Sequence, residues 1–78
     1  MNDIYWNKIN LEEFKALALL TDFELLVLET KIKGWSRTKQ AFELNCSTST
    51  IDRTIKQIRI KYDNVCNYSD ILVPRMKK

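Results

Sequence analysis

Polar side chains that can contact a phosphate or a base edge concentrate between Ser47 and Arg59. This stretch opens with four consecutive hydroxyl residues, and arginine, lysine and glutamine follow at helical spacing. Hydroxyls and amides at a helix N-terminus bind phosphate, whereas arginine, lysine and glutamine can reach base edges in the major groove of DNA. The candidate residues for such contacts are Lys39, Ser47, Thr48, Ser49, Thr50, Asp52, Arg53, Lys56, Gln57 and Arg59.

The distribution of charge along the chain agrees with a polyanionic partner. The 78 residues include 13 lysines and arginines and 10 acidic residues, for a net charge of +3. Residues 1–30 hold two bases and six acids, whereas residues 31–62 hold eight bases and two acids. A basic middle third beside an acidic first third is typical of a face that binds polyanions. A solvated charged surface would give the same counts and stays open as an alternative.

The composition argues against an enzyme. The chain has no histidine and only one glycine, so it has neither the commonest general base nor a glycine-rich phosphate loop. A chain of this length also buries too little surface to enclose a sizeable substrate cavity. Cys46 and Cys66 lack the spacing of a metal site or a disulfide scaffold, and we expect both to be reduced thiols. We expect a binding module without metal or cofactor.

The remaining pattern predicts four helices, each opened by a residue that caps helix N-termini. Thr21 and Glu24 form a capping box, and Gly34 suits the left-handed position that ends the second helix. The expected caps and helices are Asn10 before residues 11–20, Thr21 before residues 22–33, Ser36 before residues 37–44 and Ser47 before residues 48–62.

The last helix has two unlike faces. Apolar residues fall on one stripe at spacings of four, three and four, while the opposite side is polar and basic. A short helix, a tight turn and a helix of this kind are what a helix-turn-helix DNA reader requires. The fold class predicted is all-α, a small bundle with a tri-helical helix-turn-helix core at residues 21–62, an N-terminal extension with one helix at 1–20 and a tail at 63–78. The inner stripe consists of Ile51, Ile55, Ile58 and Tyr62.

Residues 20–61 contain a Leu-Thr-x-x-Glu-x-x-Val-Leu opening, a Gly-x-Ser, two inward-facing scaffold residues and a Ser-x-x-Thr-Ile start of the last helix, and Ile58 and Lys61 follow in register. The residues of this pattern are Leu20, Thr21, Glu24, Val27, Leu28, Gly34, Ser36, Ala41, Leu44, Ser47, Thr50 and Ile51. The pattern resembles, without a gap, the DNA-binding domain of the LuxR/GerE family of transcription regulators, in which the recognition helix starts Ser-x-x-Thr-Val. The resemblance implies a sequence-specific regulator that binds double-stranded DNA, with base contacts at Asp52, Arg53 and Lys56.

Three positions depart from the family pattern. Asp52 stands where a basic residue is usual, and it either accepts a hydrogen bond from a cytosine amino group or, as we expect, braces Arg53 or Lys56. Gln40 replaces an aliphatic core residue. Cys46 replaces an isoleucine-like one, so we expect it to be a small buried hydrophobe.

The two ends of the chain differ from the family as well. The fourth helix, which commonly mediates dimerisation there, is not evident after Lys61, so a homodimer is an open alternative. We expect Ile60 to face away from the core, one apolar anchor within residues 71–73, and Tyr5 and Trp6 to cover a hydrophobic surface. No run of apolar residues is long enough to cross a bilayer, so we expect a cytoplasmic, stand-alone regulator.

Two other functions share part of this pattern. The promoter-reading helix-turn-helix of sigma factors has a similar frame, so a sigma-like or RNA polymerase-associated factor is the close alternative. A protein-interaction module that receives an acidic partner is the second. The small size favours a phage or mobile-element protein, whereas the operator sequence and the choice between activator and repressor stay open.

Overall fold

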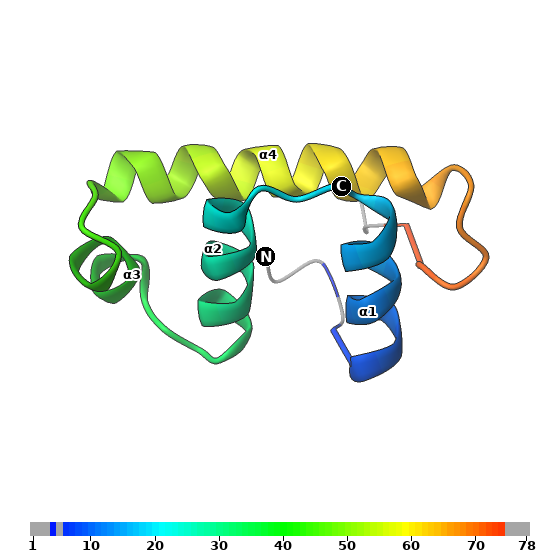
Figure 1. Ribbon diagram of the computed structural model, residues 1–78, viewed down its shortest axis with the longest axis horizontal. Coiled ribbons are helices and arrows are strands. Elements are labelled where there is room, and N and C mark those ends of the chain that lie inside the picture. Colours follow the sequence, from blue (N-terminus) through cyan, green and yellow to red (C-terminus); the bar gives the residue numbers. More distant parts are fainter. Residues whose placement is uncertain (1–3, 5, 75–78) are drawn as a thin grey trace.

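Four helices and no strand make up the part of the chain that the computed structural model describes, which is residue 4 and residues 6–74 (Figure 1). The all-α class expected from the sequence is confirmed. The helices are α1 (Lys8–Leu17), α2 (Asp22–Ile32), α3 (Arg37–Glu43) and α4 (Thr48–Cys66).

Helix α4 organises the molecule. It runs horizontally along the top of Figure 1, and α1, α2 and α3 all lie below it, so its upper side is uncovered. The predicted inner stripe is confirmed: Ile51, Ile58 and Tyr62 are buried, and Ile55 is half-buried against the same core. The other buried apolar residues are Ile4, Phe14, Ala18, Val27, Leu28, Ala41, Val65 and Leu72.

Local caps fix where three of the helices begin, as the sequence predicts. The Thr21 hydroxyl accepts from the Glu24 amide at 3.1 Å, and the Glu24 carboxylate accepts from the Thr21 amide at 2.9 Å. Ser36 and Ser47 each cap the third residue of their helix, at 3.1 Å in both cases. The capping residue satisfies an amide that has no partner within the helix, which makes these starts readable from sequence.

The first helix lies three residues earlier than expected. Its N-cap is Asn7, and Asn10 is instead the third helical residue, whose side chain accepts from the Asn7 amide at 2.7 Å. The Asn7 side chain in turn accepts from the Asn10 amide at 2.9 Å, so Asn7 and Asn10 form a reciprocal capping box and Asn10 is not the N-cap that the sequence predicts. The helix also ends earlier, because Leu19 adopts a left-handed conformation with φ of 49°.

Glycine and asparagine close the next two helices in the same way. Gly34 has φ of +94° as expected, and the Trp35 amide donates to the Thr30 carbonyl at 3.1 Å. Asn45 has φ of 56° after α3, and the Cys46 amide donates to the Ala41 carbonyl at 2.9 Å. Both ends are Schellman motifs, which turn the chain within a few residues.

The last helix is longer than expected and the chain after it folds back. Helix α4 continues four residues past Tyr62, to Cys66. Leu72 is the expected apolar anchor, and the Tyr62 hydroxyl donates to the Val73 carbonyl at 2.5 Å. Trp6, Phe14 and Tyr62 form an aromatic cluster with centroids 5.5–5.7 Å apart, which confirms the packing role of Trp6. Tyr5 lies outside the described residues.

Candidate nucleic-acid interface

The uncovered side of α4 carries most of the candidate side chains. Among the described residues, Arg53, Lys56 and Gln57 make no hydrogen bond or ion pair with another part of the chain, so their donors point to solvent. Donors that are unpaired and exposed are available to an external acceptor such as a phosphate or a base edge. The exposed candidates on α4 and at its cap are Ser47, Ser49, Asp52, Arg53, Lys56 and Gln57.

The turn between α3 and α4 fixes the direction of this face. Residues 44–47 connect the two helices, and the Schellman motif at Asn45 closes the turn at its α3 end. Both helices pack on α2 and on each other, with Ala41 buried between them and Ile51 buried on α4. The result is the short helix, tight turn and long helix that the sequence predicts.

The hydroxyl residues at the start of α4 divide into two groups. The Ser47 side chain accepts from the Thr50 amide at 3.1 Å and lies 3.0 Å from the Thr50 hydroxyl, so this pair caps the helix. Thr48 and Ser49 make no side-chain hydrogen bond within the described residues, and Thr48 is half-buried. Ser49 is therefore the hydroxyl residue best placed to contact an external group.

Two open hollows lie on opposite sides of α4, so the helix protrudes between them. One hollow, of about 300 Å³, lies between the start of α2 and the Arg53 side of α4. The other, of about 460 Å³, is lined by three basic residues, one carboxylate and one isoleucine: Lys31, Lys56, Arg59, Asp52 and Ile55. Arg59 is half-buried, so it contributes to the wall of this hollow more than to the protruding surface of α4. A protruding helix with a basic hollow along one side is a shape that a groove between phosphate backbones admits.

Asp52 pairs with Arg37 of α3, which was not among the candidate residues. Its Oδ2 accepts from Arg37 Nη1 of α3 at 2.6 Å, and no ion pair joins it to Arg53 or Lys56 in the described part of the chain. The expected bracing of Arg53 or Lys56 is therefore wrong. Helical side chains lean toward the N-terminus of their helix, so the short Asp52 side chain reaches the start of α3 rather than the next turn of α4.

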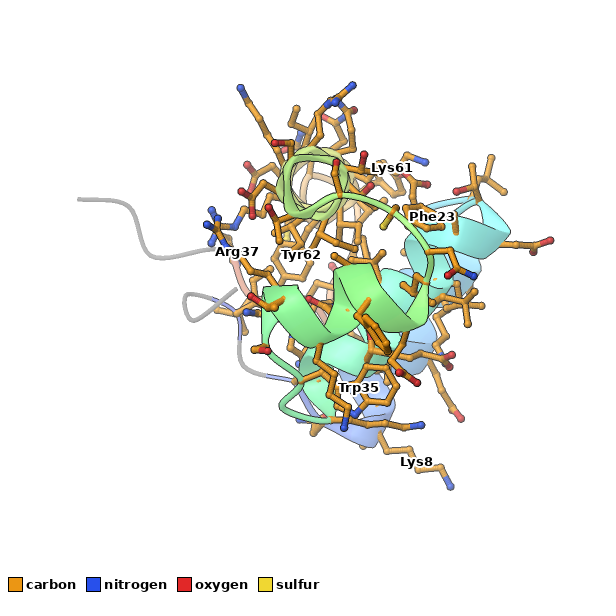
Figure 2. The ribbon with its side chains drawn as sticks, turned by 90° about the vertical axis from the view of Figure 1, so that its left-hand side faces the viewer. Lys8, Phe23, Trp35, Arg37, Lys61 and Tyr62 are labelled. Carbon is orange, nitrogen blue, oxygen red and sulfur yellow. The ribbon has the colours of Figure 1, made fainter. Side chains whose placement is uncertain are left out.

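Lys39 and Arg37 lie in different surroundings although both belong to α3. The Lys39 ammonium lies 4.5 Å from the centroid of the Trp35 ring, and Trp35 lies at the end of the molecule away from α4 (Figure 2). Arg37, by contrast, reaches the edge of α4. Arg37 is thus the α3 cation beside the open face, and its position as the first residue after the Ser36 cap is the sequence signal that could have identified it.

A second ion pair fixes α4 against α2. Lys61 Nζ lies 2.5 Å from Glu24 Oε1, and the two side chains are 29% and 12% exposed. Burial raises the pKa of Glu24, but the hydrogen bonds from Lys61 and Thr21 and the charge of Lys61 outweigh it and leave the pKa below its usual value. Lys61 and Arg37 lie on opposite sides of α4 (Figure 2), so ion pairs hold the helix from both flanks.

The structure explains the glutamine at position 40 and corrects the expectation that Cys46 is fully buried. Gln40 is fully buried, and its Nε2 donates to the Val27 carbonyl and to the Thr30 hydroxyl, both at 2.9 Å. It therefore cross-links α3 to α2 where an aliphatic residue would only pack. Cys46 is half-buried at the edge of the core, not fully buried as expected, and neither cysteine is in a disulfide. Ile60 is 44% exposed and faces away from the core, as expected.

Comparisons of the chain with protein-family models, with curated proteins and with solved structures find no match. Within the described residues, no three metal-ligating side chains come together. Over the same residues, no helix is both long enough and apolar enough to span a bilayer.

Proposed function

We propose that this protein binds double-stranded DNA sequence-specifically and regulates transcription, with α4 in the major groove as in the LuxR/GerE family that residues 20–61 resemble. One observation carries the proposal. The outer face of α4 presents Arg53, Lys56 and Gln57 without partners among the described residues, while the helix itself is fixed on its inner side and both flanks. Rigid support of an unpaired polar face favours recognition of a partner over a merely solvated surface.

Each side chain on the face has a chemistry suited to a different group on DNA. Arg53 can donate two hydrogen bonds to the O6 and N7 atoms of guanine, and Gln57 can pair with N6 and N7 of adenine. Lys56 carries a charge that can reach either guanine or a phosphate. The N-terminal amides of α4, at Thr48 and Ser49, face the end of the helix where phosphate binding is favourable.

Selection of bound duplexes from a random library by the purified chain tests the proposal. At about 150 mM salt, binding that depends on phosphate contacts alone is already weakened, so enrichment reports base reading. An inverted repeat would show a dimer that reads sequence, and a single half-site would show a monomer or a factor that works with polymerase. A folded chain that enriches no duplex would refute the proposal and favour the protein-interaction alternative.

Variants of α4 then test the mode of reading. Arg53→Ala should weaken binding to the selected site by about 1–3 kcal/mol and relax one base position. Lys8→Ala is the matched control, because Lys8 is an exposed cation of α1 at the end of the molecule away from α4 (Figure 2). Equal losses for the two variants on all DNA sequences would mean that Arg53 contributes charge without reading a base.

A further inference from the structure

The carboxylate of Asp52 lies within the open face of α4 and is only partly engaged. Its side chain is 49% exposed, and that of its partner Arg37 is 59% exposed. Arg37 Nη1 donates to Oδ2 at 2.6 Å, and within the described residues no other group donates to this carboxylate. The Oδ1 atom therefore keeps its lone pairs for an acceptor role toward an external donor.

The Arg37 contact removes the electrostatic objection to a carboxylate in a DNA interface. An unpaired Asp52 would be repelled by the phosphates on either side of the groove. A guanidinium at hydrogen-bond distance compensates that charge locally and favours an orientation of the side chain in which Oδ2 faces Arg37. The remaining N–H groups of Arg37, at the edge of α4, stay available to a phosphate.

We infer that Asp52 is a specificity-determining residue whose Oδ1 accepts a hydrogen bond from the N4 amino group of a cytosine, while Arg37 holds Oδ2. This inference rests on the proposed DNA-binding function. A carboxylate only accepts, so the O6 and N7 acceptors of guanine and the O4 acceptor of thymine repel it in the major groove. Adenine offers an N6 donor, but its N7 acceptor lies beside that donor, so cytosine is the base that matches.

The competing explanation is that the Arg37–Asp52 pair only ties α3 to α4. Replacement of Asp52 by asparagine separates the two roles, because a structural role has no base preference to change. Asparagine keeps the size of aspartate but adds an amide donor, and this donor and acceptor together match N6 and N7 of adenine.

The experiment is duplex selection followed by competition binding with wild type, Asp52→Asn, Asp52→Ala and Glu12→Ala. Glu12 is an exposed carboxylate of α1, so its removal changes the net charge equally without touching α4. We expect wild type and Glu12→Ala to select cytosine at one position, Asp52→Asn to select adenine there, and Asp52→Ala to select no base there. Asp52→Ala should lose a preference for cytosine over the other bases of roughly 5- to 150-fold, which corresponds to about 1–3 kcal/mol.

The outcomes separate this inference from the proposed function. If wild type selects a motif and both Asp52 variants select the same motif unchanged, the reading role is refuted while DNA binding stands. If wild type selects no motif, the reading role of Asp52 and the proposed DNA-binding function are both refuted. Circular dichroism of each variant confirms that the helices are intact, and the conservative Asp52→Asn change keeps the test informative if Asp52→Ala unfolds.

Discussion

The ion pair between Glu24 and Lys61 should make the stability of this fold depend on pH in the acid range. Glu24 Oε1 lies 2.5 Å from Lys61 Nζ and 2.9 Å from the Thr21 amide, in a side chain that is 12% exposed. Glu24→Gln keeps the shape and an oxygen that can accept from the Thr21 amide and from Lys61, but it removes the negative charge of the ion pair. A hydrogen bond that involves charged groups contributes about 1.5–3 kcal/mol and a neutral one about 0.5–1.5 kcal/mol, so the variant should lose about 1 kcal/mol of free energy of unfolding at pH 7.

The direction of the pH effect follows from the pKa of Glu24. Burial raises that pKa, but the hydrogen bonds from Lys61 and Thr21 and the charge of Lys61 lower it below the ordinary value of 4.5. The unfolded state therefore binds the proton more readily than the folded state. The stabilisation is fully present above about pH 4.5 and is lost as the pH falls through the lower pKa of the folded state. Glu24→Gln has no proton to bind, so its stability should lack this component.

Urea unfolding followed by circular dichroism at pH 7, 5 and 3 measures the difference. The difference in free energy of unfolding between wild type and Glu24→Gln should be unchanged from pH 7 to pH 5 and should become smaller at pH 3. Glu12→Gln provides the control, because Glu12 is exposed on α1 and pairs with no described residue. The assigned role of the ion pair would be refuted if this free-energy difference were equal at all three pH values, or if the difference between wild type and Glu12→Gln decreased in the same way.

Three further predictions concern the backbone and the core. Leu19 has a left-handed backbone and is 85% exposed, so Leu19→Gly should stabilise the fold by about 0.5–1 kcal/mol. Gly34→Ala should destabilise the fold by about 1 kcal/mol through backbone strain alone, since nothing lies within 4 Å of the added Cβ. The midpoint of thermal unfolding should therefore rise for Leu19→Gly and fall for Gly34→Ala. Gln40→Met should cost about 1–2 kcal/mol, because it removes the two hydrogen bonds that Nε2 donates to α2 and this loss is only partly offset by removal of the unpaired Oε1, whereas Gln40→Ala should cost about 2–4 kcal/mol because it also leaves a cavity; urea titration measures both. Tyr62→Phe should cost about 1 kcal/mol and speed amide exchange in residues 69–73, since it removes the hydrogen bond to the Val73 carbonyl.

The sequence predicts those features that depend on neighbours within one or two helical turns. Thr21, Ser36 and Ser47 cap the helices they were expected to cap, because each satisfies an amide three residues ahead. The inner stripe of α4 follows from helical spacing alone. The first helix was misplaced because Asn7 and Asn10 are both cap-forming residues, and the choice between them depends on where Trp6 can reach Phe14 and Tyr62.

The contacts that position the candidate site join residues far apart in the sequence. Arg37 meets Asp52 fifteen residues away, and Lys61 meets Glu24 thirty-seven residues away. No local periodicity specifies such pairs, since they depend on how α3 and α2 pack beneath α4. For the same reason the partner of Asp52 was predicted wrongly, although its place on the open face follows from helical spacing.

The length of α4 limits which part of its open face can take the proposed reading role. Nineteen residues make a helix about 28 Å long, more than twice the roughly 12 Å width of the major groove. The basic and amide side chains of the face, Arg53, Lys56 and Gln57, all lie in its first three turns, beside Arg37 and the basic hollow. Beyond Gln57 the next exposed residue on the helix is Ile60, which offers no hydrogen bond to a base. Chemistry and geometry therefore favour the same segment, so substitutions that alter base preference should map to residues 49–57, whereas those in residues 58–66 should alter stability through Tyr62 and Val65.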